Sequence, residues 1–411
     1  MSSLAKKIVI TLSILVFAYV ATGYVRARSS NDQAFRALTV YSEVLNHIQR
    51  EYVDDPNMHA VTAGALHGLV DSLDPQSGYL SPLEYNDFKE KSANGAKASA
   101  GVVLTKRSGY IAVLSVLPDS PAEKAGLHFG DLLEKIGGFT TAQMVIDQAQ
   151  ILLSGESGTV VKVSAVEMSS IRHGKLEPED IDITLAKFPT PKLVETKIEG
   201  DIAYLRVPEF SDGMSKQVHD KLAQFNQQGA HKLILDLRDS ASGNVQEGIA
   251  TAQLFVPSGT ITSLKGQTVT TETASADKSK VVWTGPVTVL IGNSTAGPAE
   301  IVASAIADNH RGETLGERTY GTASMQKLLQ LDDGSALILT VANYYTPGGK
   351  SIPADGVAPT VEVKYAPDDY AELTQPGPPP PPPGQVVSMD DPVLKKAVEI
   401  LNGATPERKA A

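Results

Sequence analysis

The sequence predicts a multidomain protein of mixed class, in which α+β parts and an α/β part follow one another along 411 residues. Three observations support this fold class. Apolar residues recur at helical spacing from about Asn31 to Ala98. Strand-like runs separated by turn signals follow from about Ser99 to Phe188. From about Thr190 to Ala366, apolar strands alternate with amphipathic helices, as in a parallel sheet with crossover connections.

The composition excludes several functional classes. A formal net charge of -11 argues against nucleic-acid binding. The chain has no cysteine, which rules out disulfides, thiol catalysis and thiolate metal sites. Its eight histidines show no metal-ligand spacing, and nothing in the sequence indicates a nucleotide. We therefore expect no cofactor and no metal.

Residues 1–30 predict an N-terminal membrane anchor or signal segment. Lys6 and Lys7 precede an uncharged run of eighteen residues, Ile8 to Val25, which is long enough to span a bilayer. Ala21 to Gly23 offers small residues for a signal peptidase, so removal of the segment stays open. Because the apolar run continues past these residues, an uncleaved anchor is the favoured interpretation.

One stretch near the C-terminal third decides what the sequence says about function. Val287 to Ile291 is a short apolar run that predicts a buried strand. A polar turn follows, and Pro298 begins a helix, where its missing N–H costs nothing. Glu300 stands in the first turn, on the favourable side of the helix dipole. A strand, a sharp turn and a helix N-terminus together often present a nucleophile or bind an anion.

The segment from Pro286 to Gln326 resembles the catalytic segment of the C-terminal processing peptidases, also called tail-specific proteases. These are serine enzymes with a Ser/Lys dyad, and the matching runs are T-A-G-P-A-E-I-V-A-S-A-I-A-D and G-E-R-T-Y-G-T-A-S-M-Q. In the family the nucleophile lies three residues before the glutamate, and the lysine follows T-[FY]-G. The resemblance therefore assigns the two dyad positions to Gly297 and Thr322, while Gln326 matches a supporting glutamine.

The resemblance also implies an altered oxyanion hole. The residue after the nucleophile, whose backbone N–H is one donor in the family, is Pro298 here and has no N–H. The family's second donor comes from a D-L-R-x-N-P-G-G loop. This chain reads D-L-R-D-S-A-S-G from Asp236 to Gly243, which keeps the strand end D-L-R and, of the loop that follows, only the last glycine. We expect Asp236, Arg238 and Asp239 to form caps or ion pairs.

A second motif resembles PDZ domains of the circularly permuted bacterial kind. The run S-P-A-E-K-A-G-L-H-F-G-D-L-L, from Ser120 to Leu133, follows their pattern. Gly101, Val102, Val103 and Leu104 match the loop that holds a peptide's C-terminal carboxylate with backbone amides, with Val103 in place of a second glycine. The alternative is a domain that only packs against its neighbours and regulates them.

The resemblance covers the chain beyond the anchor and gives the expected domains. These are the N-terminal segment (1–30), a helical domain (31–98), the PDZ domain (99–188), a peptidase-like α/β core of the ClpP/crotonase type (189–366), a proline-rich linker (367–386) and a C-terminal helix (387–411). The run L-D-P-Q-S-G-Y-L, from Leu73 to Leu80, resembles the family segment ahead of the PDZ domain. By itself it predicts a turn between helices.

Two functional hypotheses follow. The favoured one is a membrane-anchored, extracytoplasmic PDZ protein of this family that binds protein C-termini as a scaffold or adaptor without cleaving them. The alternative is an active serine-type peptidase of periplasmic proteolysis with a relocated nucleophile, for which Ser294 and Ser324 offer hydroxyls and Lys327 a lysine. The uncharged N-terminal run and the resemblance together predict a single-pass inner-membrane protein with its bulk in the periplasm or outside. Its expected partners are C-terminal peptides and the membrane, not nucleic acid, and a homo-oligomer stays open.

Overall fold

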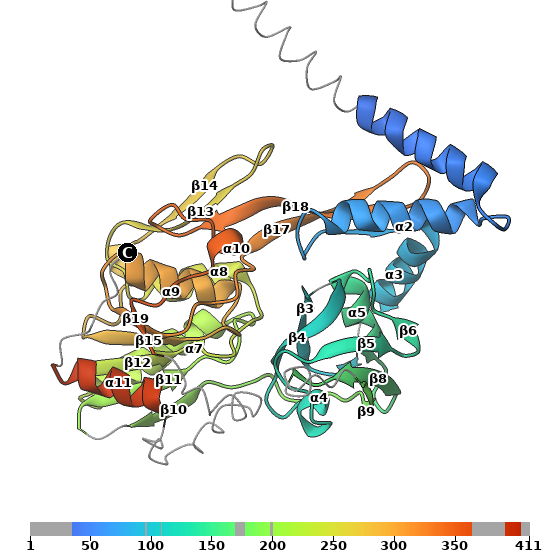
Figure 1. Ribbon diagram of the computed structural model, residues 1–411. Coiled ribbons are helices and arrows are strands. Elements are labelled where there is room, and N and C mark those ends of the chain that lie inside the picture. Colours follow the sequence, from blue (N-terminus) through green and yellow to red (C-terminus); the bar gives the residue numbers. More distant parts are fainter. Residues whose placement is uncertain are drawn as a thin grey trace, which may run out of the picture. The chain divides into compact units, whose positions relative to one another are not determined.

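The computed structural model describes residues 35–94, 97–107, 109–168, 177–197, 200–363 and 391–403 (Figure 1). The chain divides into two compact units, Met1–Leu66 and His67–Ala411, each described here by itself. Two predicted parts fall outside the described residues, namely the anchor from Ile8 to Val25 and the linker at 367–386. No helix in the described ranges is long and apolar enough to cross a membrane.

The first unit is helical, as its spacing predicts. Residues 35–51 form one helix, and α2 (Met58–Asp71) begins in this unit. The apolar stripe of the first helix stays largely exposed: Phe35 and Leu38 are 64% and 60% accessible. Helical spacing thus predicts the element correctly, although the stripe covers no core within this unit.

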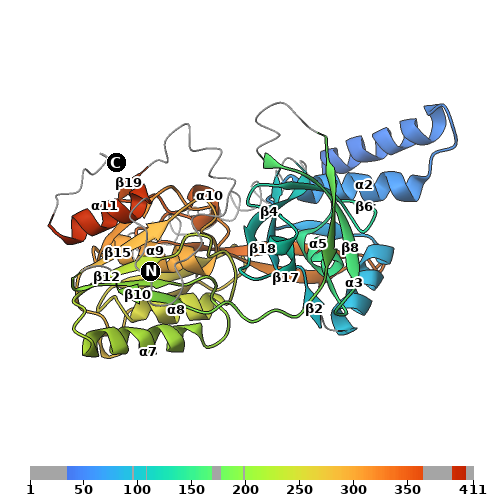
Figure 2. The same ribbon diagram turned by 90° about the horizontal axis from the view of Figure 1, so that it is seen from below.

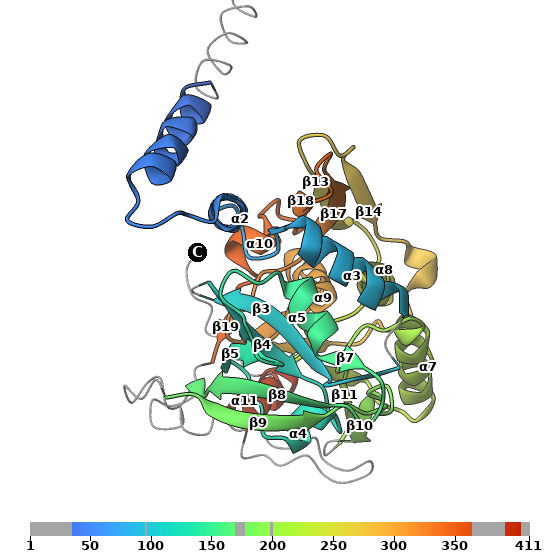
Figure 3. The ribbon, with the colours of Figure 1, turned by 90° about the vertical axis from the view of Figure 1, so that its right-hand side faces the viewer.

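The PDZ-like part of the second unit is a small antiparallel sheet with one longer helix. Its elements are β2 (Ala98–Ser99), β3 (Val102–Arg107), β4 (Tyr110–Val116), α4 (Pro121–Lys124), β5 (Leu132–Ile136), β6 (Phe139–Thr140), α5 (Ile146–Leu152), β7 (Ser154–Gly155), β8 (Val160–Val166) and β9 (Glu179–Thr184). The main order is β3-β4-β5-β8-β9, so β3 forms one edge. Figure 3 shows this sheet together with α5. Buried aliphatic residues of the strands and Ala149 of α5 form its core.

A mostly parallel six-stranded sheet forms the larger core. Its strands and helices are β10 (Val194–Lys197), β11 (Ile202–Arg206), α7 (Met214–Gln227), β12 (Lys232–Asp236), α8 (Val245–Gln253), β15 (Val287–Ile291), α9 (Pro298–Asp308), β16 (Glu313–Gly316), β19 (Val361–Glu362) and α11 (Pro392–Leu401). The order is β10-β11-β12-β15-β16-β19, and only β10 runs antiparallel to its neighbour.

Helices cover both faces of this sheet (Figure 2). One face of β12 and β15 packs with α7, α8 and α9, and the other face packs with α11. Burial on both faces explains why β15 reads as a continuous apolar run rather than an alternating one. Within the expected C-terminal segment, α11 covers Pro392–Leu401, and Asp391 caps it by accepting from the N–H groups of Val393 and Leu394.

A second, antiparallel sheet lies beside the larger one. It contains β1 (Gly78–Leu80), β13 (Thr260–Lys265), β14 (Glu272–Ser275), β17 (Ser324–Gln330) and β18 (Ala336–Tyr345), with β18 paired to β1, β13 and β17. The short elements α3 (Pro82–Asn94), η1 (Lys278–Lys280) and α10 (Ile352–Asp355) complete the description.

The turn predicted from Leu73 to Leu80 needs a correction. Its second half is the strand β1, whose residues Gly78 to Leu80 pair with Ile338 to Ala336 of β18. The local sequence contains Pro and Gly, which signal a turn, but the strand forms through a partner about 260 residues away in the chain. Ser77 reinforces the pairing by accepting from the Thr340 N–H at 3.0 Å.

Candidate functional site

The hydroxyl of Thr295 holds the turn between β15 and α9 by both accepting and donating a hydrogen bond. The Thr295 hydroxyl accepts from the Gly292 N–H at 2.9 Å and donates to the Leu237 carbonyl at 2.9 Å. This fixes the turn against the end of β12. At its last position Gly297 has φ 57° and ψ -120° and precedes the first helical residue, Pro298. The backbone there is sharply bent, as in turns that present a nucleophile between a strand and a helix.

Position 297 faces position 322. A Cβ built on Gly297 would lie 4.0 Å from the Thr322 Oγ1 and 4.0 Å from the Ala241 carbonyl oxygen, with no nearer neighbour. The space at this position is open on the side of Thr322 and Ala241, although the positive φ would strain a side chain there. The structure brings together the two positions that the resemblance assigns to the dyad.

Glu300 organises the backbone around both positions. Its carboxylate accepts from the N–H groups of Gly297, Gly321 and Thr322 at 2.9, 2.7 and 2.9 Å, and from the Thr319 hydroxyl at 2.5 Å. The side chain is completely buried. Burial raises the pKa of Glu300 to about 7, against the lowering effect of the four donors. One carboxylate thus ties the start of α9 to the 319–322 segment.

The first turn of α9 offers fewer donors than a usual helix N-terminus. Pro298 is buried at the first helical position and carries no N–H. The Gly297 N–H is already bonded to Glu300. The N–H groups of Ala299 and Glu300 donate to the Ala296 and Gly297 carbonyls at 3.3 and 3.1 Å, so no free donor from residues 297–300 replaces the one that Pro298 lacks.

The loop after β12 is held by backbone hydrogen bonds to the turn before α9 and to Phe210. The Ser240 carbonyl accepts from the Ala296 N–H at 2.9 Å, and the Ser242 carbonyl accepts from the Phe210 N–H at 2.9 Å. Gly243 pairs with Phe210 in an isolated parallel bridge. The Ser240 hydroxyl is buried and has no hydrogen-bond partner in the described part of the chain. This loop packs against the 292–297 turn, as the resemblance predicts for the oxyanion region.

The charged residues of this loop form the expected ion pairs. Arg238 bonds the buried Asp236 carboxylate at 2.6 Å and reaches Asp391, the cap of α11, at 2.5 Å. Burial alone would raise the pKa of Asp236, but the Arg238 guanidinium holds it below its ordinary value. Asp239 pairs with Arg206 at 2.9 Å. These carboxylates are engaged in structural contacts.

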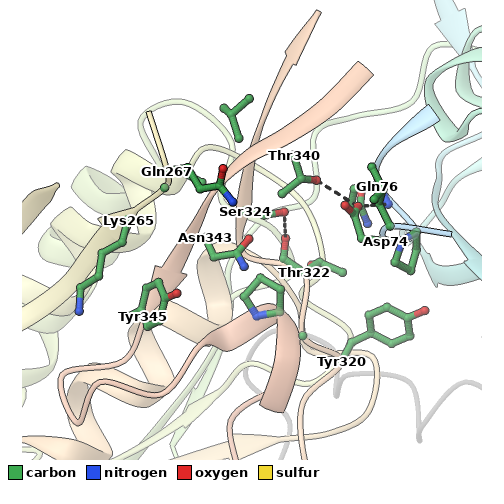
Figure 4. Close-up of a pocket in the computed structure, with 17 residues that line it drawn as sticks. Asp74, Gln76, Lys265, Gln267, Tyr320, Thr322, Ser324, Thr340, Asn343 and Tyr345 are labelled. Carbon is green, nitrogen blue, oxygen red and sulfur yellow. Dashed lines mark hydrogen bonds between the residues drawn. The ribbon is translucent and has the colours of Figure 1, made fainter. Parts of the chain in front are cut away.

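A cavity of about 680 Å³ opens beside position 322 (Figure 4). Its lining residues come from the Leu73–Gln76 segment, the end of β13, the 320–324 segment and β18. Asp74 binds this wall to β18 by accepting from the Thr340 hydroxyl at 3.0 Å. The volume lies within the usual range for ligand pockets, roughly 300–1,000 Å³. The cavity is thus large enough for a peptide segment.

The predicted carboxylate loop lies at the edge of the PDZ-like sheet. Gly101 has φ +77°, and a Cβ there would lie 2.3 Å from the Ser120 Cβ, so only glycine fits. Val102 and Leu104 point into the domain core, whereas Val103 packs toward Ala241. The loop leads into β3, whose outer edge is where an added peptide strand would pair.

The PDZ-like sheet contacts the loops around position 297. Thr105 of β3 and Tyr320 share a hydrogen bond between their hydroxyls at 2.9 Å. The Ser115 hydroxyl of β4 donates to the Asp239 carbonyl at 2.8 Å. A small apolar cluster of Leu114, Ala241 and Ala296 fills the space between them. The two parts of this unit therefore meet at the segments that carry the candidate site.

Comparisons with known proteins agree with this geometry. The profile of the PDZ domain matches residues 113–165, and that of peptidase family S41 matches residues 201–363. A carboxyl-terminal-processing protease of Synechocystis sp. is 30% identical over 347 residues, covering 81% of this chain and 80% of the relative. The chain belongs to the C-terminal processing peptidases of family S41.

Further relatives support this membership. A carboxy-terminal-processing protease of Bartonella bacilliformis is 29% identical over 352 residues, covering 83% of this chain and 79% of the relative. Among solved structures, a photosystem II D1 C-terminal processing protease has a TM-score of 0.63 at 24% identity, covering 79% of this chain and 92% of that one. At that identity the likeness concerns the fold, and it confirms the predicted mixed α/β multidomain class.

Within this S41 chain, the alternative hydroxyls have other partners. The Ser294 hydroxyl donates to Asp239 at 2.6 Å, and only 5% of Ser294 is exposed. The Ser324 hydroxyl donates to the Thr322 carbonyl at 3.2 Å and accepts from Gln326 at 2.7 Å. Lys327 lies on β17, where its backbone pairs with Leu339. Neither serine is hydrogen-bonded to a lysine or a histidine in the described part of this chain.

Three contributors to the S41 site were not predicted from the sequence. These are the multiple bonding of Glu300, the Thr105–Tyr320 contact and the cavity wall at Asp74. Only the first had a local signal, an acidic residue three positions after a helix cap, which often reaches back to the cap's N–H. As for metals, the described residues hold no group of three or more His, Asp or Glu side chains that could bind an ion.

Proposed function

We propose that this S41 family member is a membrane-anchored, extracytoplasmic PDZ protein that binds protein C-termini and does not cleave them. The observation that carries the proposal is the empty side-chain position at Gly297. A Cβ built on Gly297 would lie 4.0 Å from the Thr322 Oγ1. Glu300 holds the backbone at both positions by accepting from their N–H groups. The position supplies no hydroxyl to attack a carbonyl, and Thr322 supplies no amine to activate one.

The oxyanion side supports the same proposal. A tetrahedral intermediate needs donors aimed at its oxygen, and Pro298 gives none at the start of α9. The loop that supplies the family's other donor reads Ser240-Ala241-Ser242-Gly243 here. Binding needs none of these groups, whereas cleavage needs most of them.

A cleavage assay tests the proposal directly. The full-length protein is incubated with an unfolded substrate that ends in apolar residues and a free carboxylate, and the products are followed by mass spectrometry. We expect no cleavage above background. Cleavage that is lost on Ser294→Ala or Ser324→Ala would overturn the proposal, while cleavage that survives both variants would identify a contaminant.

The second candidate is an active peptidase with a relocated nucleophile. The relatives named above favour it, since each is called a protease. The 2.6 Å bond from Ser294 to Asp239 offers a hydroxyl beside a carboxylate. Against it, Asp239 is also bonded by Arg206, and burial leaves Ser294 little access to a substrate. The assay above decides between the two candidates.

The proposed location rests on the N-terminal sequence. Ile8 to Val25 is uncharged and long enough to span a bilayer, and members of the resembled family usually work in the periplasm. Protease added to spheroplasts is expected to degrade the part of the chain after Phe35. Protection of that part would contradict the placement. A mature N-terminus near Tyr24 would contradict the uncleaved anchor only.

The proposed partners are peptides with a free C-terminus. Gly101 leads into the edge strand β3, to which an extended peptide can add with its carboxylate against the loop amides. Amidation would remove bonds to a charged group, each worth about 1.5–3 kcal/mol. Equal affinity of the full-length protein for free-acid and amidated peptides would exclude capture of a carboxylate.

A further inference from the structure

A row of polar side chains crosses the cavity floor from strand to strand. Asn343 of β18 is paired with Ser324 of β17 on one side and with Lys265 of β13 on the other. Directly paired residues of an antiparallel sheet place their side chains on the same face. All three residues line the cavity, and Figure 4 shows Asn343 between the other two. The cavity thus presents a hydroxyl and an amide side by side, with the Lys265 ammonium over the Tyr345 ring at one end.

The cavity has one charged side chain at each end, Lys265 and Asp74, and only Lys265 is left to bind a ligand. Lys265 is the one lysine or arginine among the described residues that line it. Its ammonium lies 4.7 Å from the centre of the Tyr345 ring, which holds it at the wall without neutralising it. At the opposite end, Asp74 accepts from Gln76, Ser77 and Thr340 and has little capacity left. The Lys265 end therefore attracts an anion.

The spacing of the row fits a short extended peptide. Neighbouring strands lie about 4.8 Å apart, so the backbone of Lys265 lies roughly 10 Å from that of Ser324, two strand spacings away. An extended chain advances about 3.3 Å per residue, so about three residues cover that distance. Thr322, the position facing Gly297, lies two residues before Ser324. Leu73, Pro75 and Tyr320 give the same cavity apolar walls.

We propose that this cavity binds the last three or so residues of a peptide, with the free C-terminal carboxylate held by Lys265 and Asn343. The inference rests on the proposed function, because a bound C-terminus stays intact only if the site does not cleave it. It adds a second carboxylate site, separate from the loop at Gly101. A chain would then hold two C-terminal peptides, one at each site.

Two single-cysteine reporters separate the sites in the full-length protein. Because the chain has no cysteine, Gln267→Cys places a unique environment-sensitive dye at the cavity rim, and Gln148→Cys places one on α5 of the PDZ domain. The probe is a six-residue apolar peptide, used as the free acid and as the amide. A third peptide, amidated and ending in glutamate, tests whether a side-chain carboxylate is read instead. We expect the cavity reporter to respond to the free acid alone.

Substitutions at Lys265 give the decisive comparison. Lys265→Met should weaken the response of the cavity reporter about tenfold or more, because a charge-assisted bond is lost, and should leave the PDZ reporter unchanged. Lys265→Arg should retain most of the binding. Lys327→Met, on β17 outside the cavity lining, is the matched control and should have no effect. Both lysines are exposed, so we expect each variant to fold.

The possible outcomes distinguish this inference from the proposed function. A silent cavity reporter, an equal response to the amidated peptides, or a response untouched by Lys265→Met overturns the cavity site while leaving PDZ binding and inactivity intact. Shortening of the peptide, seen by mass spectrometry, overturns the proposed function instead. A response to the glutamate-ended amide overturns recognition of the main-chain carboxylate.

Discussion

Gly101 and Gly297 both have a positive φ, but they differ in how much space surrounds a Cβ built on them. At Gly101 in the PDZ domain, φ is +77° and a Cβ would lie 2.3 Å from the Ser120 Cβ. At Gly297 in the core, φ is +57° and a Cβ would find nothing closer than 4.0 Å. The first glycine is demanded by its surroundings. The second has open space around it, opposite Thr322, and the positive φ rather than crowding favours glycine there.

The largest expected effect concerns Glu300, which holds the backbone around Gly297 and Thr322. Glu300→Ala would leave three backbone N–H groups and the Thr319 hydroxyl without an acceptor. Each unsatisfied buried donor costs about 1–3 kcal/mol, so we expect a loss of more than about 4 kcal/mol in the free energy of unfolding. Urea denaturation measures it. A loss below about 1 kcal/mol would show that the backbone does not depend on this carboxylate.

The same carboxylate predicts a dependence of stability on pH. Burial raises the pKa of Glu300 from 4.5 to about 7, so the folded state holds a proton that the unfolded state releases. Its contribution to stability is fully present below pH 4.5 and is lost as the pH rises to about 7. The loss is on the order of 3 kcal/mol, because one pKa unit equals about 1.4 kcal/mol. Glu300→Gln should remove this slope, and an unchanged slope would assign it to other groups.

Rebuilding the dyad tests whether a serine at position 297 and a lysine at position 322 can restore cleavage. Gly297→Ser with Thr322→Lys restores a nucleophile and a base, but Pro298 still withholds a backbone donor worth roughly 2.7–4 kcal/mol, or 10²–10³ in rate. We expect the double variant to stay near background and the addition of Pro298→Ala to raise cleavage of an unfolded, apolar-tailed substrate. The altered loop at 240–243 limits the gain.

Folding of each rebuilt variant is checked by circular dichroism before its activity is compared. High activity in the double variant would mean that the missing donor does not matter. No activity in a correctly folded triple variant would place the remaining defect in the Ser240–Gly243 loop.

Two glycines of the PDZ domain separate the cost of crowding from the cost of a positive φ. Gly101→Ala should cost about 2–4 kcal/mol, because the added methyl group overlaps Ser120 and the backbone is left-handed. Gly109 is the matched control, since its φ is +81° but a Cβ there meets nothing within 4 Å. Gly109→Ala should cost only about 1 kcal/mol. Thermal unfolding ranks the two, and equal losses would mean that conformation alone, not crowding, selects glycine at position 101.

The smallest effect concerns the contact between the PDZ domain and the peptidase-like core. Removing the hydroxyl bond between Thr105 and Tyr320 with Thr105→Val or Tyr320→Phe should cost about 0.5–1.5 kcal/mol. The double variant should cost less than the sum of the two, because both remove the same bond. Strict additivity would show that the bond does not form in solution.

The sequence by itself determined the order and type of the main elements. Pro298, Glu300 and the apolar run at Val287–Ile291 predict β15, the turn and α9, and these form at the predicted residues. Their signals are local: strand burial, the fixed φ of proline and helix spacing act within a few residues. The mixed fold class and the PDZ and S41 parts follow from such signals together with the family resemblance.

Only the tertiary structure decided how distant segments combine at the site. Glu300 reaches residues 319–322, Thr105 meets Tyr320, and β1 pairs with β18 from the far end of the chain. The cavity row from Ser324 to Lys265 depends on the register of three strands. No local pattern encodes such registers, because they are set by the packing of whole elements against one another.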